Sequence, residues 1–317
     1  MDRSADISRS PSGPHAVTAE LVAVLVAVTQ GEPRVLTREG SRSLPAGPFE
    51  SSHRSLQAGM RSWVEAQTHH PLGYVEQLYT FADGDRSNFQ GQRIISVSYL
   101  GLTREAESAG VDPVQWQDWY RYFPWEDWRG GCPEVISGRI LPALRQWCGG
   151  APTPAARRQR RQRMDYTFGK DLSSWNEELV LQRYELLYEA GLVAEAGRHG
   201  RTRAGAFPPG DWMNYDHRRI LATAIARLRT KIRYRPLVFE LMPPRFTLLQ
   251  LQQAFEALAG RRLHKQNFRR FIEQQALVEE TGGMEQGAAG RPAKLFQFRG
   301  GVMLERAMAG SKLPLSR

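Results

Sequence analysis

The order of patterns between residues 247 and 298 constrains the fold of this chain more than any other feature. Residues 247–260 (TLLQLQQAFEALAG) place leucine and phenylalanine at helical spacing, which predicts an amphipathic helix. Thr247 and Gln250 have the spacing of a capping box, and Gly260 stands where a left-handed helix cap belongs. After a short turn, residues 264–275 (HKQNFRRFIEQQ) predict a second helix, so the pattern favours a helix-turn-helix.

The second of these helices is basic and amphipathic. Phe268, Phe271 and Ile272 are expected to face the core, and the polar residues around them to face outward. Residues 277–280 and 294–298 alternate like strands on either side of a glycine-rich segment, which predicts a wing. Lysine and arginine neutralise phosphates, while asparagine, glutamine and arginine can read base edges in a major groove. The candidate DNA-binding residues are Lys265, Gln266, Asn267, Arg269, Arg270, Arg291 and Lys294.

The charge of the whole chain favours a polyanionic partner. The 317 residues include 43 lysine and arginine residues against 33 acidic ones, a formal net charge of +10. Nucleic acid suits this balance because the basic residues cluster along the chain. The alternative is that the charge serves solubility alone and that the basic helix is an ordinary solvated face.

Cysteine usage and hydropathy indicate the cytoplasm. Cys132 and Cys148 are the only cysteines, so we expect free thiols in a reducing compartment. No stretch approaches the roughly 20 apolar residues of a membrane span, and no membrane partner is expected. Residues 19–28 could pass for a signal-peptide core, but the glutamate at position 20 and the lack of a cleavage site favour a buried strand. The histidines lack the spacing of a metal site, so we assign no metal.

The amino-terminal third of the chain predicts four strands and one helix. Residues 17–28, 34–37, 74–81 and 94–102 are rich in β-branched and aromatic residues, and the second of these segments suits an antiparallel partner of the first. Residues 55–67 have apolar side chains at helical spacing. Residues 1–15 are expected to form a disordered tail.

The middle of the chain gives weaker patterns. Residues 115–128 hold four tryptophans, which we expect to pack the inner part of this region rather than to cover a pocket. Residues 133–147 and 179–192 predict helices, whereas residues 151–170, rich in arginine, are expected to be a linker whose arginines meet DNA phosphates. Residues 216–232 predict a helix that joins the two ends of the chain.

Several segments resemble the Nudix-related transcriptional regulators of the NrtR type. At the amino-terminal end they are YVEQLYTFADGDR (residues 74–86) and ISVSYL (residues 95–100). The resemblance is more extensive at the other end, over residues 221–260, 267–272 (NFRRFI) and 290–298 (GRPAKLFQF). The long stretch 105–215 is similar to the insertion of the NadQ-like branch of that family.

The resemblance implies an α+β protein: a degenerate Nudix-like α/β/α sandwich followed by a winged helix-turn-helix domain. It also implies a homodimer that binds palindromic operators of NAD-metabolism genes, and a nucleotide effector held in the former catalytic pocket. The expected divisions are a tail (1–15), the Nudix-like domain (16–215) with its insertion (about 105–215), a linking helix (216–235), the winged helix (236–300) and a second tail (301–317).

The Nudix signature itself is degenerate in this chain. Only one of its four glutamates remains, because histidine, serine and alanine occupy the other three positions. The remnant comprises Gly47, His53, Arg61, Ser62, Glu65 and Ala66. A single carboxylate does not assemble the Mg²⁺ cluster that Nudix hydrolysis requires, so we expect no catalytic residues and no required cofactor. Arg61 and Glu65 either contact a ligand or form a surface ion pair.

A nucleotide diphosphate needs cations and a stacking partner. Arg86 and Arg93 flank the loop between two central strands, and Tyr79, Phe81 and Tyr99 lie on those strands. Each of these aromatic residues also suits a core position. The leading hypothesis is a repressor that senses ADP-ribose, NAD or ATP. The alternatives are a Nudix-type nucleotide pyrophosphatase and a constitutive DNA-binding protein whose Nudix-like domain serves dimerisation.

Overall fold

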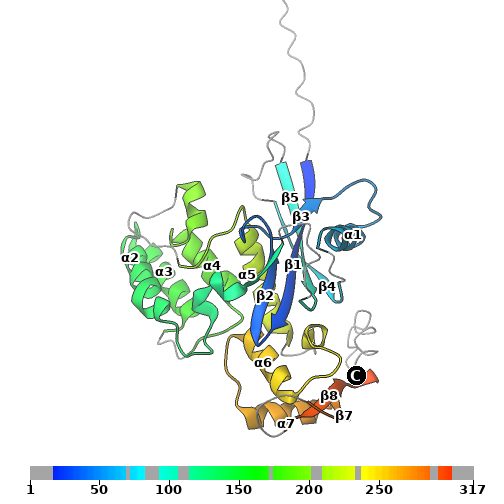
Figure 1. Cartoon of the computed structure of the whole chain (residues 1–317). Coiled ribbons are helices and arrows are strands. Elements are labelled where there is room, and N and C mark those ends of the chain that lie inside the picture. The colour runs from blue at the N-terminus through cyan, green and yellow to red at the C-terminus, as the bar shows by residue number, and fades with distance from the viewer. Residues whose placement is uncertain are drawn as a thin grey trace, which may run out of the picture.

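The computed structural model describes residues 17–68, 72–82, 93–105, 114–170, 174–200, 209–232, 237–285 and 292–301. A six-stranded sheet forms its amino-terminal part, with the strand order β4-β5-β1-β2-β6 and with β3 paired to β1 outside that path (Figure 1). The strands are β1 (Val17–Thr29), β2 (Glu32–Thr37), β3 (Ala46–Pro48), β4 (Val75–Phe81), β5 (Arg93–Leu102) and β6 (Gln115–Asp118). The sheet is mixed, because β1 runs parallel to β5 and antiparallel to β2.

The strand β1 lies in the middle of the sheet because it is apolar on both faces. Every residue from 21 to 27 is at most 1% exposed, as expected for a continuous apolar run. The turn into β2 has positive φ angles at Gln30 (54°) and Gly31 (76°), which is the conformation of a two-residue type I′ hairpin. The predicted strand and its antiparallel partner are confirmed.

Helices cover both faces of the sheet. Helix α1 (Leu56–Thr68) contributes Met60 and Val64 to an apolar cluster with Leu25. Helix α5 (His217–Ile232) contributes Ile220 to the core on the other face, together with Val24 of β1. Because neighbouring residues of a strand point to opposite faces, Leu25 and Val24 divide β1 between the two layers. The predicted helix–sheet–helix arrangement is therefore present (Figure 1).

The region between β6 and α5 is largely helical. It contains α2 (Leu141–Gly149), α3 (Pro154–Phe168) and α4 (Val180–Glu189), and a π-helical turn (Ile136–Ile140) precedes α2. The tryptophan-rich stretch forms two short 3-10 turns, Trp119–Arg121 and Pro124–Glu126. The side chains of Trp119 and Trp125 are 0% exposed. The expectation that these tryptophans pack the interior is confirmed for this pair.

The segment predicted to be a linker is a helix, so that prediction was wrong. The Thr153 side chain accepts a hydrogen bond from the Ala156 amide at 3.1 Å, and Pro154 takes the first helical position. Met164 and Phe168 anchor the end of α3 in the core. The helix escaped prediction because nine residues in succession, 155–163, include no large apolar side chain, so no apolar stripe marks its first turns.

The helix α5 is buried on most of its sides rather than exposed as a tether. It packs against β1, β4 and β5 in the sheet, against α4 in the inserted region, and against α6 (Leu248–Ala259). Ten of its residues are buried, including the charged residues Arg218 and Arg229. A movement of α5 would therefore displace several elements together.

The carboxy-terminal unit is the predicted winged helix. It consists of a 3-10 turn (Leu237–Leu241), α6, α7 (Lys265–Gln275), β7 (Val278–Met284) and β8 (Lys294–Phe298). The capping box is present: Gln250 N donates to Thr247 Oγ1 at 3.2 Å, and Thr247 N donates to Gln250 Oε1 at 2.8 Å. Gly260 caps α6 in the left-handed conformation with φ 70°. Phe268 and Ile272 are buried as predicted, but Phe271 is 37% exposed and the prediction that it faces the core was wrong.

Both cysteines carry free thiols, as predicted, with Cys132 exposed and Cys148 buried. Burial raises the pKa of the Cys148 thiol, and partial desolvation raises that of the Cys132 thiol, which favours the protonated and less reactive form of both. Within the described ranges, no helix combines the length and the apolar character needed to cross a membrane.

Candidate functional site

The polar face of α7 is open to a partner. Lys265, Gln266, Asn267, Arg269 and Arg270 are all exposed. The structure gives none of their side chains a hydrogen bond or an ion pair with another described residue. Five polar side chains on one exposed helix, three of them cationic, can bind phosphates and base edges without breaking an existing contact.

The wing carries fewer available cations than the sequence suggested. Lys294 Nζ lies 2.9 Å from Glu280 Oε1 in a surface ion pair across the two strands. Gln297 Nε2 donates to Glu279 Oε1 at 2.8 Å in the next cross-strand pair. Arg291 lies outside the described residues. Within the described winged helix, α7 is therefore the stronger candidate for DNA contact than the paired strands of the wing.

A buried carboxylate shapes the turn between the two helices. Glu256, 4% exposed, accepts hydrogen bonds from the Leu263 amide (2.9 Å) and from Gln252 Nε2 (2.8 Å). Arg262 Nη1 lies 3.0 Å from the other carboxylate oxygen. Burial alone would raise the pKa of Glu256, but these hydrogen bonds hold it below its ordinary value. This residue was missed at the sequence level, where it stood among ordinary polar positions of an amphipathic helix.

The end of α6 is held by groups from other parts of the chain. Tyr120 Oη donates to the Ala257 carbonyl at 2.7 Å, and Arg229 Nε donates to the Leu258 carbonyl at 2.9 Å. The amide of Trp128 donates to the Gly260 carbonyl at 2.7 Å. The last carbonyls of a helix have no partner within the helix. Three of them are satisfied here by Tyr120 and Trp128 of the tryptophan-rich stretch and by Arg229 of α5. We call this set of bonds at the end of α6 the joint, because it connects the winged helix to the rest of the molecule.

A fully buried charge cluster lies behind this joint. Glu126 accepts from Arg183 Nε at 2.6 Å and from Arg229 Nη1 at 2.7 Å, and all three side chains are 0% exposed. Arg183 belongs to α4 and Arg229 to α5. A buried pair of this kind is tolerated only when its remaining donors are satisfied. Arg229 meets that condition by bonding to backbone carbonyls of Leu258 and Glu177.

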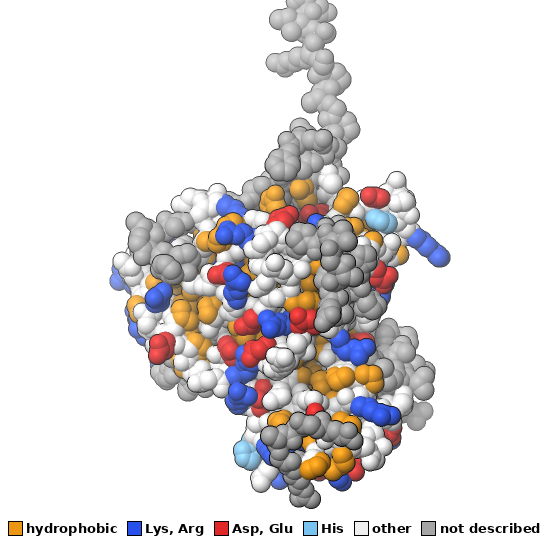
Figure 2. Space-filling model, in the orientation of Figure 1, with side chains coloured by type: hydrophobic (Ala, Val, Ile, Leu, Met, Phe, Trp, Pro, Cys, Tyr) orange, Lys and Arg blue, Asp and Glu red, His pale blue; other side chains and the backbone are white. Residues whose placement is uncertain are grey.

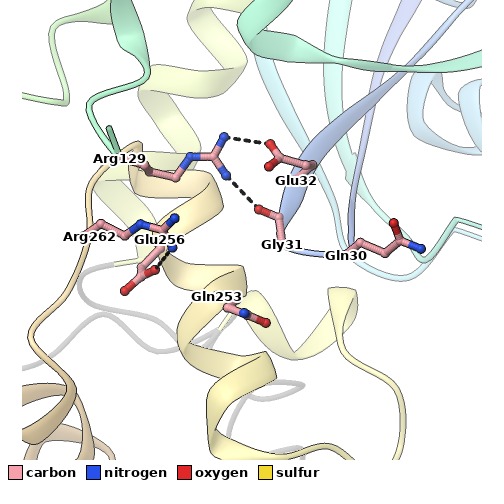
Figure 3. A pocket seen from close by; sticks show the side chains of 7 residues that line it. All are labelled: Gln30, Gly31, Glu32, Arg129, Gln253, Glu256 and Arg262. Atoms are coloured by element: carbon pink, nitrogen blue, oxygen red, sulfur yellow. Dashed lines mark hydrogen bonds and ion pairs between the residues drawn. The ribbon is translucent and has the colours of Figure 1, made fainter. Parts of the chain in front are cut away.

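A small polar cleft opens between the β1–β2 turn and α6 (Figure 3). It is lined by Gln30, Gly31, Glu32, Arg129, Gln253, Glu256 and Arg262. Its volume of about 120 Å³ is well below the ~300–1,000 Å³ of a site for a molecule the size of a nucleotide. Its cations are also engaged, since Arg129 bonds to the Gly31 carbonyl (2.8 Å) and to Glu32 (2.7 Å), and Arg262 bonds to Glu256. The cleft is therefore a small polar gap beside the joint and not a nucleotide site.

Three residues of the segment that was compared with the Nudix signature have structural contacts. Arg61 does not pair with Glu65; it donates to the carbonyls of Leu72 (2.7 Å) and Gly73 (3.0 Å) and so supports the entry to β4. The Glu50 amide donates to His53 Nδ1 at 3.1 Å. A side chain at Gly47 would meet the Trp63 ring, since an added Cβ would lie 2.2 Å from Nε1.

The remaining members of this segment, Ser62, Glu65 and Ala66, are exposed on α1. No group of three or more histidine, cysteine, aspartate or glutamate side chains with metal-binding geometry occurs in the described parts of the chain.

The aromatic candidates for the nucleotide site separate into two classes. Phe81 and Tyr99 are each 3% exposed and belong to the core. Tyr79 is 60% exposed, and its ring packs edge-on against Phe81 with centroids 5.2 Å apart. Arg86 lies outside the described residues, and only the backbone of Arg93, at the start of β5, is described. Of the three aromatic rings, Tyr79 alone presents a surface on which a base could stack.

The carboxy-terminal unit matches a known domain family. Residues 238–298 match the model of the NrtR DNA-binding winged helix domain. Over these residues the chain is similar to that domain family. A curated relative, the ADPR responsive transcriptional repressor NtrR of Acinetobacter baylyi, is 44% identical over 84 residues, which are 26% of this chain and 33% of the relative. The match thus spans about a third of the length of that relative.

Solved NrtR structures share the fold of the chain beyond the winged helix. NrtR of Shewanella oneidensis complexed with a 27mer DNA superposes with a TM-score of 0.53 at 20% identity, covering 90% of this chain and 94% of that one. Another structure of Shewanella oneidensis NrtR gives a TM-score of 0.51 at 19% identity and covers 89% of this chain and 94% of its own.

At these identities the likeness concerns the fold alone, and it confirms a Nudix-like α/β domain followed by a winged helix. The predicted resemblance to NrtR-type regulators is confirmed with it, whereas the NadQ-like branch stays a prediction.

Proposed function

We propose that this protein is a nucleotide-responsive DNA-binding repressor of the NrtR type that acts on palindromic operators of NAD-metabolism genes. The observation that carries the proposal is the NrtR winged helix domain, whose second helix presents a polar face free of bonds to other described residues. The net charge of +10 suits a polyanionic partner. A palindrome matches a two-fold symmetric protein, so the proposal includes a homodimer in the cytoplasm.

The proposed effector is ADP-ribose, with NAD and ATP as the other candidates. It is supported by the Acinetobacter baylyi relative, an ADPR responsive repressor, of whose length the match covers 33%. In this chain the effector would lie in the Nudix-like domain, assigned to residues 16–215. Tyr79 supplies an exposed ring, and Arg86 and Arg93 are the nearest sequence candidates for its phosphates.

The Nudix-like domain is proposed to bind its nucleotide without hydrolysing it. Glu65 is the one carboxylate left of the signature, and it lies exposed on α1. Arg61 is occupied by two carbonyls on the entry to β4 and not by a carboxylate. Hydrolysis of a pyrophosphate by this family of sites needs several carboxylates on the metal.

The proposed coupling between effector and DNA runs through α5 and the end of α6. α5 packs on the sheet of the Nudix-like domain, and its Arg229 bonds directly to the Leu258 carbonyl of α6. Such coupling requires that the effector has different affinities for the DNA-competent and incompetent states. By linkage, DNA must then change effector affinity by the same factor.

The test is a fluorescence anisotropy titration of the full chain against palindromic duplexes taken from the DNA upstream of its own and neighbouring genes. Each titration is run at physiological salt with and without ADP-ribose, NAD and ATP, and a scrambled duplex of the same length is the control. The proposal expects sequence-specific binding that one nucleotide changes by roughly 5- to 150-fold.

Two other results would redirect the proposal. Specific binding that no nucleotide alters would favour a constitutive DNA-binding protein. Absence of specific binding, together with Mg²⁺-dependent release of AMP from ADP-ribose that Glu65→Ala abolishes, would establish a hydrolase.

A further inference from the structure

The two residues that α7 buries define which of its side chains point toward a partner. Phe268 is 5% exposed and Ile272 is 1% exposed, one turn apart on the inner face. Successive residues are separated by about 100° around a helix. Arg270 lies between the two in sequence, about 160° from each, and therefore points directly away from the core. Gln266, one turn before Arg270, shares that outer face.

The other polar residues of α7 lie to the sides. Arg269 is about 100° from Phe268 and about 60° from Ile272, and Lys265 is closer still to the inner face. Asn267 lies on the opposite side, at about 100° from Phe268. Side chains on the flanks of a helix in a major groove face the two phosphate backbones, whereas side chains on its outer face meet the base edges.

Charge is arranged unevenly along α7. The cations Lys265, Arg269 and Arg270 occupy its first two turns, and the acid Glu273 begins the last turn. An acid near a phosphate backbone is unfavourable, so the first two turns are the part that can approach DNA closely. Arg270 and Gln266 both belong to that part.

The guanidinium of Arg270 differs from most described arginines in having no described partner. Arg129, Arg183 and Arg229 each bond to carboxylates or carbonyls, and Arg262, in the same domain, is paired with Glu256. Arginine in a free fork geometry can donate two hydrogen bonds to the O6 and N7 atoms of guanine, and glutamine can bond in the same bidentate way to adenine.

We propose that Arg270 is the principal base-reading residue of this protein and recognises a guanine in each half-site, and that Gln266 recognises an adenine. Lys265 and Arg269 bind phosphates and set affinity without sequence preference. The inference rests on the proposed DNA binding and specifies how that site discriminates sequences.

The experiment is a selection of bound duplexes from a randomised pool with the full chain, followed by affinity measurements on the selected sites. The key variant is Arg270→Gln, because glutamine prefers adenine where arginine prefers guanine. The matched control is Arg269→Gln, which removes the same charge from the neighbouring position. Gln266→Ala tests the second contact, and circular dichroism of each variant verifies the fold.

We expect the wild-type protein to prefer guanine at one position of each half-site by about tenfold or more, and Arg270→Gln to move that preference to adenine. Arg269→Gln should weaken binding to all duplexes by a similar factor and leave the selected sequence unchanged. A selected sequence that survives Arg270→Gln but is lost in Asn267→Ala would overturn the assignment while leaving DNA binding intact. If the wild-type protein selects no sequence, the proposed function itself fails.

Discussion

Gly260 occupies a position that suits no other residue type. Its φ of 70° is in the left-handed region, and an added Cβ would lie 2.4 Å from the Glu126 carbonyl oxygen and 2.7 Å from Arg229 Nη2. The sequence predicted a glycine cap from the end of an apolar stripe. The contact with the carbonyl of Glu126, 134 positions earlier in the chain, could be recognised only from the tertiary structure.

We expect Gly260→Ala to lower the free energy of unfolding by about 2–4 kcal/mol, because it adds a steric clash to the left-handed strain. Gly40→Ala is the control: Gly40 has φ 65° and no atom within 4 Å of an added Cβ, so it should lose about 1 kcal/mol. Urea denaturation measures both. Equal losses would mean that the contact at Gly260 relaxes without cost.

The buried carboxylate of Glu126 should matter far more than an exposed one. Glu126→Gln leaves Arg183 and Arg229 without their counter-charge in the interior, and we expect a loss of about 3–5 kcal/mol. The control Glu280→Gln breaks the exposed pair with Lys294 and should cost about 1 kcal/mol or less. A small effect at Glu126 in the same urea titration would indicate that water enters the cluster.

Tyr122 gives the protein a pH-dependent stability in the alkaline range. Burial raises the pKa of its hydroxyl from 10.0 to about 12 in the folded state. A folded pKa above the unfolded value stabilises the fold below pH ~10, and this contribution, about 2 kcal/mol or more, is lost as the pH rises toward 12.

Urea titrations at pH 8, 10 and 11 should show the decline. Tyr122→Phe should flatten it, although this variant starts from a lower stability because the bond to the Ser41 carbonyl (2.6 Å) is lost. An unchanged slope in this variant would assign the decline to other tyrosines.

At the scale of elements, α3 carries cations that its own contacts do not use. Arg160 stacks on Trp147 at 4.2 Å, and Arg163 pairs with Glu189 at 2.6 Å. Arg158 and Arg161 are exposed and form no hydrogen bond or ion pair with another described residue. On the face seen in Figure 2, basic side chains are scattered and many lie beside acidic ones.

We expect the double variant Arg158→Gln/Arg161→Gln to weaken binding to all duplexes and to flatten the salt dependence by roughly one to two units of slope, because each phosphate contact releases about one counterion. Anisotropy titrations over a range of salt concentrations measure the slope. The control Arg163→Gln removes a paired arginine and should leave the slope unchanged. Loss of specific binding alone would contradict a phosphate role for α3.

At the scale of the whole molecule, the joint at the end of α6 links the proposed effector domain to the proposed DNA-binding face. Tyr120 Oη connects the tryptophan-rich stretch to α6 through the Ala257 carbonyl, and Arg229 Nη2 lies 3.3 Å from the same hydroxyl. The joint consists of directional hydrogen bonds, which hold the end of α6 in one position. It can therefore transmit a displacement of α5 or of the stretch 119–128 to the winged helix.

Removal of the Tyr120 hydroxyl should reduce the effect of the nucleotide on DNA affinity more than it reduces DNA affinity itself. We expect Tyr120→Phe to bind the operator within about threefold of wild type, and the nucleotide to change that affinity several-fold less than the 5- to 150-fold typical of coupled sites. The control Tyr122→Phe removes a hydroxyl that bonds within the amino-terminal part. If Tyr120→Phe keeps the full nucleotide response, coupling takes another route.

The sequence alone determined the elements whose formation depends on residues close together in the chain. The capping box of α6, its glycine cap, the strands β1, β4 and β5, and the buried residues Phe268 and Ile272 follow from spacing and turn preferences that act over a few residues. The winged-helix fold could be predicted because those local signals agree with one another in a short segment.

The tertiary structure decided which polar groups meet. Glu126, Arg183 and Arg229 come from distant parts of the chain, and no local pattern marks three charged residues as buried. The same holds for Arg61, whose partners are carbonyls rather than Glu65, and for α3, which is helical through its cap and its anchored end. Periodicity reports which side of an element is apolar, but a buried charge is stable only where the folded chain supplies its partners, and that placement is set by the whole fold.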